Sequence, residues 1–229
     1  MTWREIAPGV AVMQYPLRAF GIDFRRCVTL LRLADGRVVI HSSAPFTAED
    51  AVAIRRFGVP SWLVEATLMH DTFARPVSAV FPDLPYLAPD GFAKLSGVPT
   101  RPLYPPPSAW AGEIEVLKVE GLRKINEHAL FHRASRVLVL ADLFFHFPVD
   151  SRSWPRFFAR YIMRLPRLSG VSAFVRLMIR DREAFAFSMK KMLKWDFEQI
   201  VVGHGEPIQN DAKRIVAQAL RDRGFAIDG

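Results

Sequence analysis

Three apolar-rich segments of the sequence each end at a side chain that can bind a metal ion. The segments and the residues that follow them are Trp62–Met69 with His70, Val137–Ala141 with Asp142, and Ile200–Gly203 with His204. Short apolar runs of this kind are typical of buried strands, whose two faces both lie in a core. Ligands collect at the strand ends of α/β folds. The three segments therefore predict a sheet-containing fold with a shared site at one edge.

The last of these strand ends has a local composition that suits a binding site. His204 stands between Gly203 and Gly205 in the stretch IVVGHGEPI. Glycine tolerates positive φ and lets the backbone approach another group closely. This sequence predicts that the histidine is presented at the end of the strand rather than buried along it.

The order of the other elements indicates a mixed fold. Asp35-Gly36 separates two β-rich runs, Val28–Leu33 and Arg37–His41, which is a strong hairpin signal. Thr47 is expected to cap the helix that follows it, with Asp50 three residues on. Antiparallel strands come first, and strands then alternate with helices. This order favours an α/β (α+β) sandwich with sheets in the middle and helices outside.

Length and composition narrow the class of protein. The chain has 229 residues, half of them hydrophobic, so we expect one domain, 1–229, with a sizeable core. The single cysteine, Cys27, excludes an intramolecular disulfide and any cysteine-rich zinc site, and it is expected in the core. The N-terminus lacks a signal-peptide apolar region, and the apolar runs are too short to span a bilayer. The sequence thus predicts a soluble cytoplasmic protein.

The positive charge is concentrated in one segment, residues 151–195. This segment holds eleven Arg and Lys against two acids, whereas the whole chain has a net charge of +8. The segment is expected to be helical, as a basic insertion in the domain. Four arginines recur at every fourth position and predict a cationic stripe on one helix face. They are Arg152, Arg156, Arg160 and Arg164.

Aromatic and aliphatic residues accompany this stripe, from Trp154 to Leu165. One interpretation is an accessory helical pair that covers the sandwich, with solvated arginines. The other is a lid or surface patch for anionic lipid or an acidic substrate. The sequence contains no recognised nucleic-acid-binding motif. The apolar side of the segment is also a candidate homodimer interface.

Several stretches resemble a known superfamily. They are the hairpin region Val28–Ser43, the stretch FHRASRVLVLADL at Phe131–Leu143, and the terminal VVGHGEPI. The chain resembles the metallo-β-lactamase superfamily over most of its length, and more closely an uncharacterised domain family within it. The resemblance implies a four-layer αββα sandwich and a hydrolytic site with one or two metal ions.

The sequence departs from the usual metal motifs of that superfamily. Aligning Thr67 with the motif T-H-x-H-x-D-H keeps His70 but replaces the other three ligands. The replacements are Leu68, Thr72 and Phe73. The expected G-H-T motif falls near Leu122 without a histidine, and His41 stands where the superfamily has an aspartate. The resemblance thus implies that the binuclear site is lost.

The residues that remain define the candidate site. Asp142 and His204 match ligand positions, and His70 is the third candidate ligand. Asp71 is a candidate additional ligand or catalytic base, and His41 and Glu127 are candidates for supporting the ligands. Three ligands plus water suit a catalytic zinc ion, and the carboxylate also suits iron or manganese. Such an ion would activate water and polarise a carbonyl or phosphoryl oxygen.

Two functions follow from these observations. The first is a metal-dependent hydrolase of an unidentified small molecule, anionic or phosphorylated in keeping with a cationic lid. The second is a catalytically inactive member with a vestigial site and no metal. In that case the basic amphipathic helices would dock to a membrane surface or a protein partner.

Overall fold

The computed structural model describes residues 2–19, 21–147, 153–165 and 167–227. Its larger sheet has seven strands in the order β1-β2-β5-β6-β7-β8-β9. These strands are β1 (Arg4–Ala7), β2 (Val10–Tyr15), β5 (Arg26–Arg32), β6 (Arg37–His41), β7 (Val59–Val64), β8 (Tyr86–Ala88) and β9 (Arg101–Pro102). Strands β1 to β6 pair antiparallel, and β6 to β9 pair parallel.

The second sheet has four strands in the order β10-β11-β12-β15. They are β10 (Ile114–Lys118), β11 (His128–His132), β12 (Val137–Val139) and β15 (Gln199–Val201). A three-stranded sheet continues from this region in the order β14-β13-β16, and β3 and β4 form a separate hairpin. Their bounds are β13 (Phe145–His146), β14 (Ser169–Gly170), β16 (His204–Gly205), β3 (Arg18–Ala19) and β4 (Ile22–Asp23).

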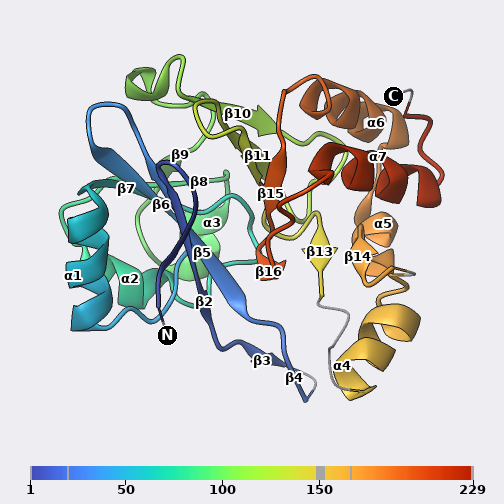
Figure 1. Cartoon of the computed structure of the whole chain (residues 1–229), viewed down its shortest axis with the longest axis horizontal. Coiled ribbons are helices and arrows are strands. Elements are labelled where there is room, and N and C mark those ends of the chain that lie inside the picture. The colour runs from blue at the N-terminus through green and yellow to red at the C-terminus, as the bar shows by residue number, and fades with distance from the viewer. Residues whose placement is uncertain (1, 20, 148–152, 166, 228–229) are drawn as a thin grey trace.

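Helices cover both outer faces of the two sheets (Figure 1). On the side of the large sheet they are α1 (Ala48–Phe57), α2 (Ala74–Val80) and α3 (Phe92–Ser96). On the other side they are α4 (Ser153–Phe157), α5 (Ala173–Met178), α6 (Arg182–Met192) and α7 (Ala212–Asp222). A 3-10 turn at Ser108–Trp110 and a π-helix, η2 (Phe158–Ile162), complete the set. No helix in the described ranges is long and apolar enough to cross a membrane.

Three apolar clusters fill the spaces between these layers. Along β5, Cys27 and Leu31 point into the cluster between the sheets, whereas Val28 and Leu30 pack against the α1–α3 layer. This alternation follows from the two-residue period of a strand. A third cluster joins the outer face of the second sheet to α5, α6 and α7. The architecture is therefore the predicted αββα sandwich.

Local predictions for the N-terminal half are confirmed. Strands β5 and β6 form the expected hairpin, with Gly36 at φ +86° in its turn. Thr47 caps α1, its side chain accepts from the amide of Asp50, and the Asp50 carboxylate accepts from the amide of Thr47. Cys27 is buried, as expected.

The basic segment 151–195 is mostly helical but is not one continuous helix. It contains α4, η2, strand β14, α5 and α6. The four-residue repeat of arginines therefore does not continue along a single face. Arg156 and Arg160 lie on α4 and η2, whereas Arg164 follows the helix with φ +53°. Arg152 lies outside the described residues, and that the segment is an insertion stays a prediction.

Candidate metal centre

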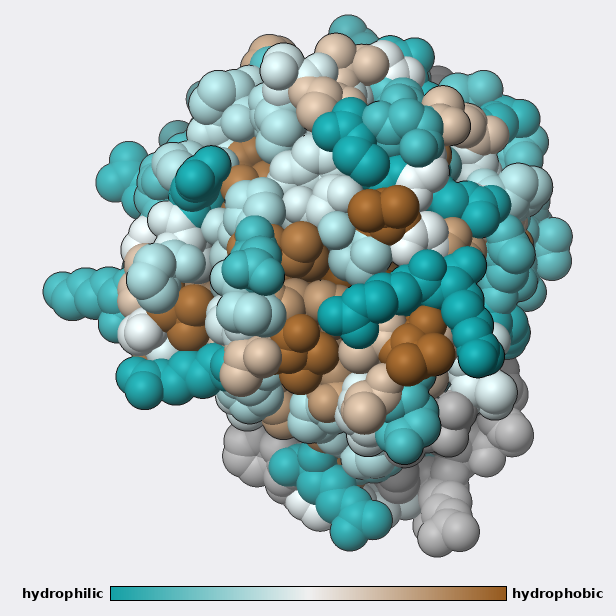
Figure 2. All heavy atoms as spheres, turned by 90° about the vertical axis from the view of Figure 1, so that its left-hand side faces the viewer, coloured by the Kyte–Doolittle hydropathy of each residue, from teal (hydrophilic) through white to brown (hydrophobic). Residues whose placement is uncertain are grey.

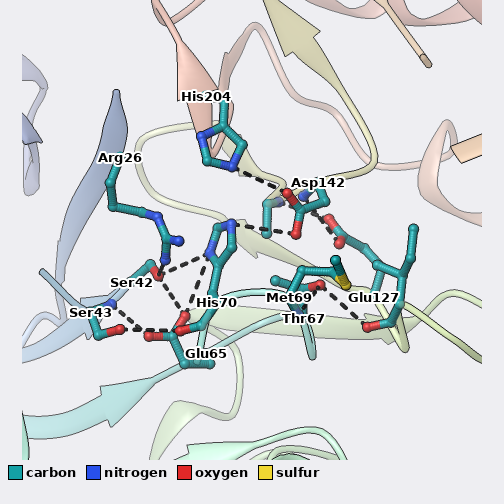
Figure 3. A network of polar contacts seen from close by, with 12 residues as sticks. Arg26, Ser42, Ser43, Glu65, Thr67, Met69, His70, Glu127, Asp142 and His204 are labelled. Carbon is teal, nitrogen blue, oxygen red and sulfur yellow. Dashed lines mark hydrogen bonds and ion pairs between the residues drawn. The ribbon is translucent and has the colours of Figure 1, made fainter. Parts of the chain in front are cut away.

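The three predicted ligands come together at one edge of the sheets (Figure 3). His70 lies between β7 and α2, Asp142 follows β12, and His204 begins β16. One ligand atom from each lies within 4.8 Å of the other two. The Nε2 atom of His70 is 3.4 Å from Oδ2 of Asp142, and Nε2 of His204 is 3.2 Å from Oδ1.

These distances and the chemistry of the donors fit a metal ion. Tetrahedral ligands at about 2.1 Å from zinc are about 3.4 Å apart. Two atoms of the cluster, Nε2 of His70 and Oδ2 of Asp142, are buried and contact each other at 3.4 Å, but no hydrogen bond of good geometry satisfies either of them in the described chain. Buried polar atoms are normally satisfied, so each such atom requires a reason. A divalent ion held by two imidazoles and a carboxylate would supply it.

His204 is held by contacts on both sides of its ring. Its Nδ1 lies 2.9 Å from the carbonyl oxygen of Arg25, which can only accept, so Nδ1 carries the proton. The ring stacks on Phe145 at 5.7 Å between centroids, and Phe24 meets it edge-on at 6.2 Å. Nε2 is therefore left as a lone-pair donor aimed at Asp142. Burial lowers the pKa of His204, which favours the neutral ring that a metal needs.

His70 is oriented by a hydroxyl group. Its Nδ1 lies 3.0 Å from Oγ of Ser42. Ser42 donates its one proton to Oε2 of Glu65 at 2.5 Å, so it accepts from His70 and from the guanidinium of Arg26 at 3.1 Å. Nδ1 of His70 therefore carries a proton, and Nε2 faces Asp142. A histidine ligand whose second nitrogen donates outward is the usual arrangement at metal sites.

Glu65 is a fully buried carboxylate beneath this arrangement. Besides Ser42, it accepts from the amide of Ser43 at 2.6 Å and from the hydroxyl of Tyr86 at 3.2 Å. Burial alone would raise the pKa of Glu65, but His70 and Arg26 outweigh it and keep the carboxyl below its usual pKa. Conversely, Asp142 and Glu65 raise the pKa of His70 against its burial and the charge of Arg26.

Glu127 supports Asp142 from the opposite side. Its carboxylate accepts from three consecutive amides, those of Ala141, Asp142 and Leu143, at 2.8–3.2 Å. The predicted supporting position of Glu127 is therefore next to the ligand. Burial and the nearby Asp142 raise the pKa of Glu127 to about 8. His70 and His204 overcome the effect of burial on Asp142 and hold its pKa well below the usual value.

Two other predicted site residues lie close by but outside the three-residue cluster. Asp71 is half-buried next to His70, and its carbonyl accepts the amide of Ala74 at the start of α2. His41 ends β6, is buried, and has no hydrogen-bond partner on either ring nitrogen within the described chain. Burial lowers the pKa of His41 to about 4, so the ring is neutral. Their roles stay predictions.

The positions where the superfamily pattern predicts further ligands carry no metal-binding side chain. Leu122 is buried in the cluster under the second sheet, and Leu68 packs against the α1–α3 layer. Phe73 is half-buried at the start of α2, and Thr72 is exposed. The donors that the described chain brings together therefore suit one ion rather than two.

The buried polar residues behind His70 were not predicted from the sequence. Glu65 stands inside the run Trp62–Met69, where a charged residue among apolar ones is itself a signal of a paired buried group. Ser42 and Ser43 end the hairpin strand, but serine there carries no distinct signal. Arg26 has no sequence signature of burial, because arginine is nearly always exposed unless paired.

A surface hollow lies beside His204. Its volume is about 700 Å³, and its walls include residues of β2 together with Arg25 and Glu206. These two side chains form an ion pair at 3.0 Å, and Gln14 donates to the carbonyl of Gly205 at 2.6 Å. His70 and Asp142 do not line this hollow. It is therefore a neighbour of the metal cluster rather than its entrance.

Comparison with known proteins identifies the fold. No protein-family model and no curated protein sequence matches the chain. A metallo-beta-lactamase from Erythrobacter litoralis with beta mercaptoethanol in the active site aligns with 96% of this chain and 96% of its own, with a TM-score of 0.66 and 13% identity. A metallo-beta-lactamase from Pontibacter korlensis aligns over 96% and 99%, with a TM-score of 0.61 and 12% identity.

A third solved structure, of TMB-1, aligns over 97% of this chain and 98% of its own, with a TM-score of 0.65 and 13% identity. Identities this low show the fold alone. The chain has the metallo-β-lactamase fold, as the resemblance predicted. The closer likeness to one uncharacterised domain family stays a prediction.

Proposed function

We propose that this protein is a metal-dependent hydrolase that uses one divalent ion. One observation carries the proposal, namely the buried His70–Asp142–His204 cluster, in which an Nε2 atom of each histidine faces the Asp142 carboxylate at 3.2–3.4 Å. In a protein of this fold, such a cluster is expected to hold zinc, with iron or manganese as alternatives for a site with a carboxylate.

The chain's own residues have separate roles in this proposal. His70, Asp142 and His204 hold the ion, which when bound supplies a Lewis acid and makes water acidic enough to be a nucleophile near neutral pH. Ser42 and the Arg25 carbonyl fix the imidazole tautomers, and Glu127 fixes the backbone on which Asp142 stands. Asp71 is the proposed proton acceptor, since it is next to a ligand in sequence and not fully buried.

The proposed substrate is a small anionic ester, such as a phosphoester. The bound ion itself would attract an anionic group, whereas the nearby arginines have counter-charges of their own, Glu206 for Arg25 and Glu65 for Arg26. A positive surrounding raises the local concentration of anionic substrates. Two ester substrates with the same leaving group, one neutral and one anionic, can be compared. Faster hydrolysis of the anionic ester would show the preference.

Metal analysis tests the first half of the proposal. Protein purified without chelator is dialysed separately against zinc, manganese and iron(II), and bound metal is measured by mass spectrometry. We expect one ion per chain in the wild type and loss of the ion in Asp142→Ala and His204→Ala. His146→Ala is the matched control, because that histidine is near the site in sequence but outside the cluster. If none of the three metals binds, the hydrolase proposal is wrong and the alternative of a vestigial, metal-free site replaces it.

Hydrolysis assays test the second half. Metal-loaded and chelator-treated protein are compared on carboxylic esters, lactones and phosphodiesters. We expect turnover that disappears with chelator and with Asp142→Ala. Metal binding without turnover of any of these classes would count against the hydrolase and keep the metal site.

A further inference from the structure

Exposed aromatic rings form a row on α4 and η2. Trp154, Phe157 and Tyr161 have exposed fractions of 49%, 46% and 60%. Their spacing of three and four residues places them along one face of the helical segment. The Trp154 and Phe157 rings stack at 5.7 Å, and the Phe157 and Tyr161 rings lie 4.8 Å apart. Exposed aromatic rings that cluster in this way mark an interaction site.

Arginines lie beside this row. Arg156, Arg160 and Arg164 are exposed, and none of them pairs with a carboxylate among the residues that the structure describes. Elsewhere the exposed arginines commonly have partners, as Arg167 has in Asp222 and Arg136 in Asp196. The helical segment is therefore amphipathic, with rings and free positive charges together on its outer side.

On the α1 side of the molecule, arginine side chains cover aromatic rings. There Arg32 covers the ring of Phe57 at 4.8 Å, and Arg55 covers Phe81 at 5.3 Å. Figure 2 shows that the hydrophobic residues on this face appear as separate patches among hydrophilic ones. On α4 and η2, the rings of Phe157 and Tyr161 contact each other and stay exposed. The contrast indicates that they are kept available for a partner.

The aromatic row also lies at a protruding end of the molecule. In Figure 1, α4 and the β3–β4 hairpin project together below the sandwich. A Cβ at Gly21, in the hairpin turn, would lie 3.6 Å from the Trp154 indole nitrogen, so the two elements are in contact. Phe24 continues this contact inward, edge-on to Phe158 at 5.7 Å and to the ligand His204 at 6.2 Å. A protruding end can meet a flat surface without a clash from the rest of the chain.

We propose that α4 and η2 dock the protein on an anionic lipid bilayer. Tryptophan and tyrosine favour the headgroup region, and arginines beside them pair with anionic headgroups. A second copy of the chain fits less well, because a two-fold contact would bring both sets of unpaired arginines together. Single-stranded nucleic acid fits less well because Phe157 already stacks on Trp154 and contacts Tyr161, which leaves fewer ring faces for base stacking.

Vesicle sedimentation tests the charge part of this proposal. The full chain is mixed at low salt with vesicles of phosphatidylcholine alone or of two parts phosphatidylcholine to one part phosphatidylglycerol. We expect binding to the anionic vesicles only, weakened by salt, and at least about tenfold weaker in R156E/R160E. The matched control is R55E/R56E, with the same charge change on α1, and it should bind as the wild type does.

A second pair of variants tests the aromatic part. F157S/Y161S should also bind anionic vesicles at least about tenfold more weakly. V52S/L95S, which removes two exposed apolar side chains from α1 and α3, should not. Circular dichroism and urea unfolding show whether each variant is folded. Binding that R156E/R160E and F157S/Y161S leave unchanged would overturn the proposal, as would absence of binding by the wild type.

The competing partners give different results. A dimer in sedimentation velocity that F157S/Y161S converts to a monomer, without vesicle binding, would replace the bilayer with a second copy. Binding of a single-stranded oligonucleotide in place of vesicles would replace it with nucleic acid. Vesicle binding does not depend on the metal ion, so its failure and the failure of the hydrolase proposal are separate results.

Discussion

The Nδ1 atom of His70 lies 3.6 Å from Oε2 of Glu65, whereas its Nε2 lies 3.4 Å from Oδ2 of Asp142. The imidazole is thus held between a buried carboxylate and the carboxylate of the metal cluster. Ser42 stands between the ring and Glu65 and hydrogen-bonds to both. The dependence of the His70 orientation on Ser42 can therefore be tested by changing Ser42 alone, with all three metal ligands in place.

Replacing Ser42 with alanine should weaken metal binding while the three ligands remain. The ring of His70 loses the hydrogen bond that fixes its tautomer, and loss of such a contact costs about tenfold to a hundredfold in affinity. Competition titration of zinc against a chromophoric chelator measures the change. Ser61→Ala, whose hydroxyl donates to the Val59 carbonyl away from the cluster, is the matched control. An affinity equal to the wild type in Ser42→Ala would show that Ser42 does not position His70.

Replacing Glu65 with alanine should destabilise the fold itself. Arg26 and His70 would lose their buried counter-charge, and breaking a buried pair typically costs about 3–5 kcal/mol. Urea unfolding of metal-free protein measures the free energy of unfolding. Glu120→Ala removes an exposed carboxylate and should change it by less than about 0.5 kcal/mol. A Glu65→Ala protein as stable as Glu120→Ala would mean that the buried charges are not paired as described.

The sequence predicts the metal ligands better than it predicts what supports them. Asp142 and His204 stand out because each ends an apolar strand, and the geometry of a sheet brings such ends together. His70 also follows an apolar segment, but its match to the superfamily motif depends on the register of Thr67. Arg26 and Ser42 meet across the predicted hairpin, but Ser42 also contacts Glu65 and His70 from other elements, and no local pattern encodes those contacts.

The course of the basic segment 151–195 was also only partly predictable from the sequence. Its repeat of arginines predicted one helix face, because the period of a helix is nearly four residues. The π-helix at Phe158–Ile162 and the left-handed backbone of Arg164 interrupt that period. Packing of Ala159 and Met163 into the core sets where the helix ends, and this packing depends on the rest of the fold.

Two replacements of Glu127, by alanine and by glutamine, should show how much its hydrogen bonds to the backbone contribute to the stability of the fold. Glu127→Ala leaves three buried amides, those of Ala141 to Leu143, without an acceptor, at about 1–3 kcal/mol for each unsatisfied group. Glu127→Gln keeps one acceptor oxygen and should cost less. Urea unfolding of both variants measures the difference. Equal stability of Glu127→Ala and the wild type would contradict the role assigned to this carboxylate.

Cys27 should be inert in the folded protein. The thiol is buried in β5, and burial raises its pKa to about 12, so almost no reactive thiolate exists at pH 8. A thiol reagent such as dithionitrobenzoate should label native protein negligibly and label one thiol per chain in concentrated urea. Rapid labelling of the folded chain at pH 8 would show that β5 opens or that the residue is accessible.

Replacing Gly205 should disturb both stability and metal binding, because no side chain fits at this position. Gly205 has φ +104°, and a Cβ there would lie 1.8 Å from the carbonyl oxygen of His146. Gly205→Ala should therefore cost about 3 kcal/mol or more and displace the adjacent ligand His204. Gly36→Ala is the matched control, since φ there is +86° but a Cβ meets nothing within 4 Å, so only the backbone cost of about 1–2 kcal/mol applies. Urea unfolding and zinc titration measure the two effects. If both variants lose the same stability and bind zinc equally, the close approach of β13 and β16 does not hold His204 in place.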